Sequence, residues 1–218
     1  MSSFQALANL IKFKLAGRPY HASLFRVGMV LEPDPTPFIL AAGAIKVADP
    51  TGGEKLVVSA VVSLKAGDVN LTRLHLGDSG KFLQLAVSDD GRVEECRYFS
   101  LVDRETPPDE DTWDVWLNPD QGLIGWPQFQ TLDGQLYDRV WSPGLSRIEP
   151  IAFEAKVTAA DGSHTLDTRA MLYARTTGLA EPAPQAEYLM VAVVENGEEA
   201  WVDLHAGIDL NPAALTLA

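Results

Sequence analysis

Acidic residues gather around two tryptophans in the middle of the chain, and side chains of these types could carry out acid–base chemistry. Trp113 and Trp116 are surrounded by five carboxylates: Asp109, Glu110, Asp111, Asp114 and Asp120. Most glycosidases work with two carboxyl groups placed across a bound sugar. The sequence does not give the separation of any two carboxylates, and runs of acids are usually solvated loops. An enzyme acting on a carbohydrate or another polar small molecule is therefore an alternative, not the leading prediction.

Other signatures of catalysis and of cofactor binding do not occur in the sequence. It contains no GxSxG, HExxH, P-loop, GxGxxG, EF-hand loop or CxxC. The four histidines, His21, His75, His164 and His205, lack the spacing of metal ligands. The single cysteine, Cys96, excludes a disulfide within this chain and a cysteine-based zinc cluster. We therefore expect no cofactor and no metal, and a non-enzymatic role is favoured.

A different grouping, GWPQFQTLDGQLYDRVW at residues 125–141, has the composition of a contact surface. A two-residue turn at Asp133-Gly134 would set the register, and residues that face each other across a hairpin share one side of it. The predicted face consists of Trp126, Gln128, Gln130, Tyr137, Arg139 and Trp141. Trp, Tyr and Arg are enriched at binding hot spots, so this face is a candidate binding surface. The alternative is a face covered by another sheet or loop, with Arg139 in a buried ion pair or stacked on indole.

Short apolar runs alternate with turn signals after residue 37, which is typical of β-hairpins. The turn signals are Thr51-Gly52-Gly53, Gly77-Asp78-Ser79-Gly80, Asp90-Gly91, Asp133-Gly134, Asp161-Gly162 and Asn196-Gly197. The expected fold is mainly β, with about 10–12 antiparallel strands in a hairpin-rich sandwich or open barrel and a short N-terminal helix.

Two-residue turns also predict the register of three further hairpins. At Asp90-Gly91 the predicted pairs are Phe82–Phe99 and Gln84–Arg97, with Leu83, Leu85, Val87, Cys96 and Tyr98 on the opposite, core side. At Asp161-Gly162 they are Lys156–Asp167 and Glu154–Arg169 on a solvent face, and Val157–Leu166, Phe153–Ala170 and Ile151–Leu172 on the core face. At Asn196-Gly197 they are Val193–Ala200, Val191–Val202 and Leu189–Leu204. Cys96 is accordingly predicted to be a buried thiol and not a nucleophile.

Residues 1–30 form a separate unit, a predicted helix followed by a basic arm. Residues 1–31 carry four basic and no acidic residues, and the remainder carries 13 basic and 30 acidic residues, hence +4 against −17. The helix, with Phe4, Leu7 and Ile11 on one face, either packs on its own domain or contacts a membrane surface or a partner through residues 1–16. Residues 31–218 are predicted to form the antiparallel β domain, as one unit or as two β halves joined near 103–112.

Composition restricts the class of protein and its expected compartment. Apolar residues make up 46% of the chain and charged residues 22%, which is typical of a folded domain with a sizeable core. No apolar run has the ~20 residues of a membrane helix, and no signal peptide is recognised at the N-terminus. A net charge of −13 argues against a nucleic-acid partner. With a single cysteine, these features favour the cytoplasm.

The run DQGLIGWPQFQTLDGQLYDRVW, residues 120–141, resembles a segment of the YjfK-like family of bacterial proteins of unknown function. Its Gly-Leu-Ile-Gly, Asp-Gly and Tyr-Asp-Arg-Val-Trp pieces carry the resemblance. The family implies no activity. It implies a bacterial cytoplasmic protein linked to the envelope, with a phage-shock-protein-A-like or small membrane protein as the expected partner.

The leading functional prediction is a non-enzymatic binding or adaptor protein that acts near the inner face of the membrane through a partner. The alternatives are the enzyme described above and a β-barrel carrier of an apolar ligand. Three structural observations separate them. A deep apolar pocket with few acids would favour the carrier, and two carboxylates about 5–9 Å apart in a cleft would favour a hydrolase. A flat, exposed aromatic patch would favour the adaptor.

Overall fold

The computed structural model describes residues 20–50, 55–77, 80–197, 199–212 and 215–217. The predicted helix at residues 1–16 lies outside these ranges, so its proposed contacts stay predictions. None of the helices in the described ranges has the length and apolar character needed to span a bilayer.

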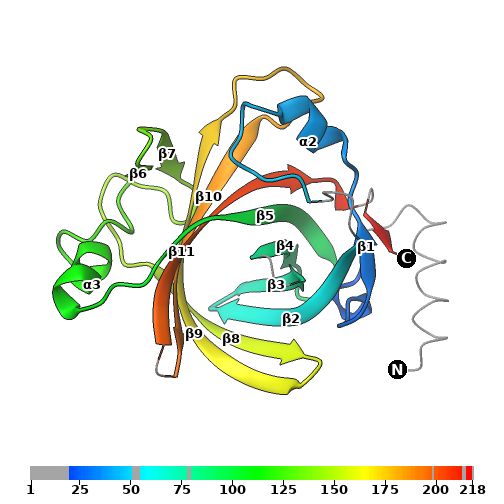
Figure 1. Ribbon diagram of the computed structural model, residues 1–218, viewed down its shortest axis with the longest axis horizontal. Helices are drawn as coiled ribbons and strands as arrows, with labels where there is room; N and C mark the ends of the chain where they lie inside the picture. The colour runs from blue at the N-terminus through cyan, green and yellow to red at the C-terminus, as the bar shows by residue number, and fades with distance from the viewer. Residues whose placement is uncertain (1–19, 51–54, 78–79, 198, 213–214, 218) are drawn as a thin grey trace.

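Eight long strands form a closed antiparallel barrel (Figure 1). They are β2 (Leu56–Ala66), β3 (Val69–Leu76), β4 (Lys81–Val87), β5 (Val93–Glu105), β8 (Ile151–Ala159), β9 (Gly162–Thr176), β10 (Ala186–Asn196) and β11 (Glu199–Leu210). The order around the barrel is β2-β3-β4-β5-β11-β10-β9-β8, and β8 pairs back onto β2. The predicted mainly β, antiparallel fold is confirmed, and strands from both sides of residues 103–112 belong to the same barrel.

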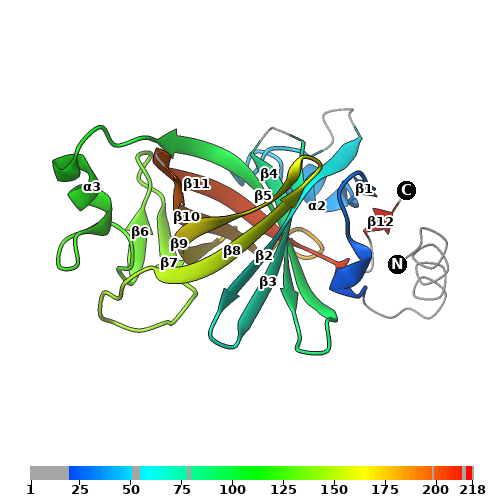
Figure 2. The same cartoon turned by 90° about the horizontal axis from the view of Figure 1, so that it is seen from below.

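Shorter elements cover the outside of the barrel, and Figure 2 shows them in two groups on opposite sides of it. The first group comprises the 3₁₀ turn Ala22–Leu24, β1 (Val30–Glu32), α2 (Thr36–Ala41) and β12 (Thr216–Leu217). The second comprises α3 (Glu110–Leu117), β6 (Gln128–Gln130) and β7 (Leu136–Arg139). Pairing of β1 with β2 and of β7 with β9 attaches both groups to the barrel.

Apolar residues on the outer face of the barrel pack against these covering groups. On β10, Leu189, Val191 and Val193 are buried in a cluster that contains Trp116 of α3 and Ile124. The intervening residues of β10 face the barrel interior. A second cluster packs Phe38 of α2 against Tyr98 of β5, with ring centroids 5.2 Å apart. Strands such as β10 are therefore buried on both faces, which explains their nearly continuous apolar sequence.

The Asp90-Gly91 hairpin has the predicted pairs: Phe82 faces Phe99, and Gln84 faces Arg97. The turn itself is one residue longer than predicted, since the Ser88 N–H bonds to the Arg92 carbonyl and the Gly91 N–H bonds to the Ser88 carbonyl. A β-bulge between Ala86 and Val87 restores the register beyond it. Cys96 is buried as predicted, and burial raises the pKa of its thiol to about 12.

Two other predicted registers are wrong by two residues, although the faces are right. Glu154 faces Asp167 instead of Arg169, because Ala159 pairs with Gly162 and the turn lies one residue earlier than predicted. Val193 faces Val202 instead of Ala200, because Asn196 pairs with Glu199 and that turn lies one residue later. An even shift keeps every side chain on its side of the sheet. The predicted Lys156–Asp167 and Glu154–Arg169 ladder does not form, yet all four side chains are exposed.

Gly207 of β11 allows Phe99 to lie flat against the inner wall of the barrel. A Cβ at this position would lie 2.5 Å from the Phe99 ring and 2.8 Å from the Tyr98 carbonyl oxygen. We expect Gly207→Ala to lower the free energy of unfolding by about 1–3 kcal/mol, the usual cost of overpacking, in urea titrations. Gly144→Ala is the control, since its Cβ would meet only Arg139 Nη2 at 3.5 Å. Equal stability of the two variants would contradict this account.

Candidate functional site

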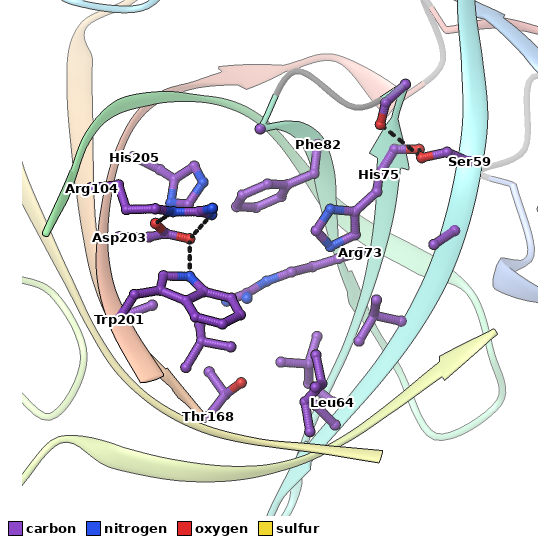
Figure 3. A pocket seen from close by; sticks show the side chains of 18 residues that line it. Ser59, Leu64, Arg73, His75, Phe82, Arg104, Thr168, Trp201, Asp203 and His205 are labelled. Atoms are coloured by element: carbon purple, nitrogen blue, oxygen red, sulfur yellow. Dashed lines mark hydrogen bonds and ion pairs between the residues drawn. The ribbon is translucent and has the colours of Figure 1, made fainter. Parts of the chain in front are cut away.

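A cavity of about 310 Å³ lies inside the barrel, near the end that carries the β3–β4, β8–β9 and β10–β11 turns (Figure 3). This volume is at the lower end of the range for small-molecule sites, about 300–1,000 Å³. Arg104 and Trp201 lie at its rim, and the Arg104 side chain is 49% exposed.

The lining divides into a polar and an apolar wall. Most of the polar and aromatic residues come from the adjacent strands β3, β4, β5 and β11: Arg73, His75, Phe82, Arg104, Trp201, Asp203 and His205. The other four strands supply Ala60, Val62, Leu64, Ala155, Leu166, Ala192 and Val194, with Ser59 and Thr168 as the polar members. Ser59 and Ala60 are consecutive because the register of β2 shifts beside them. Alternate residues of a strand point to opposite faces, so each wall uses every second residue. The cavity is therefore amphipathic.

Asp203 is held by two side chains at the rim. Arg104 donates to its carboxylate through Nε at 2.6 Å and Nη2 at 2.8 Å, and the Trp201 indole N–H donates at 3.0 Å. The Arg104 guanidinium also lies 5.0 Å from the centroid of the Trp201 ring. The hydrogen bond to Asp203 raises the pKa of Arg104. Both carboxylate oxygens thus already have donors, which leaves Asp203 poorly placed to act as a base.

Arg73 is the buried cation of the site. The whole residue is 8% exposed. Its Nε donates to Gln84 Oε1 at 3.0 Å, and its Nη2 lies 2.9 Å from Met190 Sδ. Its guanidinium carbon lies 5.0 Å from the Phe82 ring centroid. Within the described residues, no carboxylate lies within 4.0 Å of Arg73. Burial lowers its pKa to about 10, so it remains charged at neutral pH.

Two neutral histidines flank Phe82 on the polar wall. The ring centroids of His75 and His205 lie 5.5 Å and 4.9 Å from that of Phe82. Burial, with the nearby charge of Arg73, lowers the pKa of His75 to about 4 and that of His205 to about 3. His205 Nδ1 is buried without a hydrogen-bond partner. No group of three His, Cys, Asp or Glu side chains that could hold a metal ion occurs in the described part of the chain.

The predicted binding face at residues 126–141 does not exist as one face. Gln128 pairs with Asp138 and Phe129 with Tyr137, one residue away from the predicted register. The loop contains three residues, Leu132 to Gly134, because the Thr131 N–H bonds to the Gln135 carbonyl and Gly134 has a φ of 85°. A shift of one residue moves side chains of one strand to the opposite side. Tyr137 and Arg139 are therefore buried, whereas Trp126, Gln128 and Gln130 are exposed.

The buried members of that set have structural partners. Arg139 donates to the carbonyl oxygens of Ser142, Ser146 and Gly144 at 3.1, 2.9 and 3.3 Å, and also to that of Gly125. Arg139 thus binds backbone carbonyls, and neither the expected ion pair nor the indole stack forms. Tyr137 donates to Glu187 Oε2 at 2.9 Å. Trp141 is half-buried and packs beside Phe153, with ring centroids 5.6 Å apart. A contact role for Trp126, Gln128 and Gln130 stays a prediction.

The acids around Trp113 and Trp116 belong to helix α3 and its cap. Asp109 accepts a hydrogen bond from the Thr112 N–H at 2.9 Å, and Glu110 and Asp111 occupy the first helical turn, where the helix dipole favours negative charge. Trp116 is buried against the barrel. None of these acids lines the cavity, whose described lining contains Asp203 as its one carboxylate. The paired carboxylates expected of a hydrolase are thus not brought together there.

Sequence reasoning missed the cavity residues, although a signal was present. In Arg73-Leu74-His75-Leu76 and in Trp201-Val202-Asp203-Leu204-His205, polar or aromatic residues alternate strictly with aliphatic ones. This period of two places the functional side chains together on one face of each strand.

Fold and cavity together define the class: an eight-stranded antiparallel β-barrel protein with an amphipathic internal cavity. The chain belongs to the family described as "protein of unknown function (DUF2491)", whose model matches residues 13–216. The prediction of an uncharacterised family is confirmed, but the match does not extend to the narrower YjfK-like name. No curated protein matches the chain. A search of the solved structures also found no match.

The two cavity histidines make stability depend on pH. Their pKa values in the folded protein lie below the value of about 6.5 for unfolded histidine, so the unfolded state binds more protons as the pH falls. We expect the free energy of unfolding to be unaffected by these groups above about pH 7. Between about pH 6 and 4 it should fall by up to about 1.4 kcal/mol per pH unit for each histidine. Urea titrations at several pH values measure this slope.

Replacing both side chains, in His75→Gln with His205→Gln, should flatten the slope between pH 6 and 4. His164→Gln is the matched control, because His164 is exposed near the start of β9 and is not part of the described cavity lining. A slope that persists in the double variant would show that other groups cause the acid sensitivity.

Proposed function

We propose that this protein binds a small molecule inside its barrel, as a carrier or sensor and not as an enzyme. The observation that carries the proposal is the amphipathic cavity of about 310 Å³, with one aliphatic wall and one polar wall. Ligand sites are typically concave and mostly apolar, with a few converging polar groups that fix the orientation of the ligand. A barrel filled only for stability would contain interdigitated side chains instead.

The disposition of the polar groups supports binding over catalysis. A glycosidase-like reaction needs two carboxyl groups with separate roles. In the described lining, Asp203 is the one carboxylate, and Arg104 and Trp201 occupy both of its oxygens. His75 and His205 could donate or accept hydrogen bonds, but their lowered pKa values make both poor bases near pH 7.

A second candidate function is the protein contact predicted from the sequence. The chain between β5 and β8 exposes several large apolar side chains, with Leu132 99%, Leu145 97% and Trp126 40% exposed. Exposed apolar side chains are a feature of contact surfaces when they form a patch. A phage-shock-protein-A-like or small membrane protein remains the proposed partner for this surface. The two functions are compatible, because the cavity and these residues lie on different parts of the molecule.

The cavity proposal predicts a bound molecule in protein purified from cells. We expect mass spectrometry of the denatured protein to detect a small molecule released in stoichiometric amount. In Ala192→Phe the added ring fills part of the cavity, so the molecule should be lost while the thermal melt shows a folded protein. Ala192 is 2% exposed and lines the apolar wall.

Ala152→Phe is the matched control, because Ala152 is exposed on the outer face of β8. It should retain the molecule. Should Ala192→Phe be too unstable, Ala60→Phe on the same wall takes its place. Equal amounts of released molecule in blocked and control variants would place the binding site outside the cavity.

A further inference from the structure

We propose that the ligand is a small organic oxyanion, with its acidic group bound by Arg73 and its apolar body against the aliphatic wall of the cavity. This inference rests on the proposed function, and it names the chemical class that the cavity selects. Carboxylates, phosphates and sulfonates each present two acceptor oxygens that a guanidinium can bind through two parallel hydrogen bonds.

The charge of the cavity is opposite to that of the protein. Its described lining contains two arginines and one aspartate, hence a net charge of +1 with both histidines neutral, inside a chain of net charge −13. Arg104 and Asp203 form an ion pair at the rim and cancel each other. Arg73 thus has no ion-pair partner of its own among the described residues. Burial lowers its pKa, and the more distant Asp203 carboxylate offsets only part of this effect.

Burial makes this unpaired charge costly. A buried cation is normally paired with an anion, because transfer from water removes its hydration. The contacts of Arg73 are instead with the neutral amide of Gln84, the sulfur of Met190 and the ring of Phe82. Among the described residues these contacts use two N–H donors, and a guanidinium has five, so three are left for a ligand. A bound oxyanion would supply both the missing charge and the missing acceptors.

The position of the two walls orients the rest of the ligand. Arg73 projects into the cavity from β3, next to Val62 of the adjacent strand β2. Leu64, Ala155 and Ala192 continue the aliphatic wall over β2, β8 and β10. A ligand with its oxyanion on Arg73 can therefore bury an alkyl or ring portion against these side chains. Burial of each CH₂ group adds about 0.8 kcal/mol.

Titration calorimetry with three probes of equal chain length tests the inference: octanoate, octan-1-ol and octylammonium, each added to protein that has been unfolded, stripped of ligand and refolded. We expect octanoate to bind at least about tenfold more tightly than octanol, and octylammonium most weakly. In Arg73→Met, octanoate affinity should fall about 10- to 100-fold, to the level of octanol, while octanol affinity is unchanged. Octyl phosphate, titrated in parallel, separates a carboxylate preference from a phosphate preference.

Two controls distinguish recognition from a structural role of Arg73. Arg169→Met removes an arginine from the outer face of the same barrel, where the side chain is 52% exposed, and should leave all affinities unchanged. The ligand-free Arg73→Met protein should melt at the same or a higher temperature than the wild type, because an apolar side chain replaces an unpaired buried charge. Arg73→Lys keeps the charge without the planar fork, and it should bind octanoate with intermediate affinity.

The outcomes that contradict the inference differ from those that contradict the cavity proposal. Equal affinity of wild-type protein for octanoate and octanol, or octanoate binding that survives Arg73→Met, would overturn the anion inference and leave the binding cavity intact. A lower melting temperature of Arg73→Met with octanoate affinity retained would assign Arg73 a structural role. If none of the probes binds and no molecule is released from purified protein, the proposed function itself fails.

Discussion

The pairing of β8 with β2 closes the barrel, and the positions of the other elements depend on that closure. A closed barrel has no free edge along its wall, so the backbone groups of the eight strands are satisfied by their neighbours. Closure also separates an inner from an outer face of every strand. The outer face then needs a cover because it is largely apolar, and the segments around α2 and α3 provide one on each side. The inner face is shielded from bulk water, which lowers the pKa values of Arg73, His75 and His205.

The distribution of polarity in this barrel has an energetic consequence. Large apolar side chains such as Trp116, Phe38 and Ile124 are buried on the outside, where each contributes roughly 1.5–3 kcal/mol. The inside contains Arg73, Asp203 and two neutral histidines, whose burial costs free energy unless each finds a partner. Only Asp203 has a full set of partners within the described residues. The two apolar clusters on the outside of the barrel therefore supply burial that does not depend on the residues that line the cavity.

Two hairpins of this chain show how far turn signals determine register. The loops at Ser88–Arg92 and Thr131–Gln135 have the same hydrogen-bond pattern, with a glycine of positive φ at the fourth position. Both contain one residue more than a two-residue turn. In the first hairpin a bulge beside Ala86 compensates, so the pairing from the sequence is correct. No such bulge follows the second loop, so Tyr137 and Arg139 move to the buried side. Sequence specifies the loop, but the bulge depends on how the strands pack, and a one-residue difference decides which side chains are accessible.

The cavity was harder to predict because the usual inference from alternation reverses in a covered barrel. An antiparallel strand with one apolar and one polar face is normally read as core on one side and solvent on the other. On β11 the apolar side chains of Val202 and Leu204 pack outward against the covering segment. The polar side chains of Asp203 and His205 point inward. Nothing local distinguishes these residues from surface residues, because their environment depends on strands that are distant in the sequence. Arg104 and Asp203, for example, are 99 residues apart.

A polar residue that faces solvent needs no explanation, but a buried residue with an unpaired charge does. In this barrel the fold does not require a cation at position 73, because an apolar side chain would fill that place at lower cost, and the reason for an arginine there must be sought in what the cavity binds.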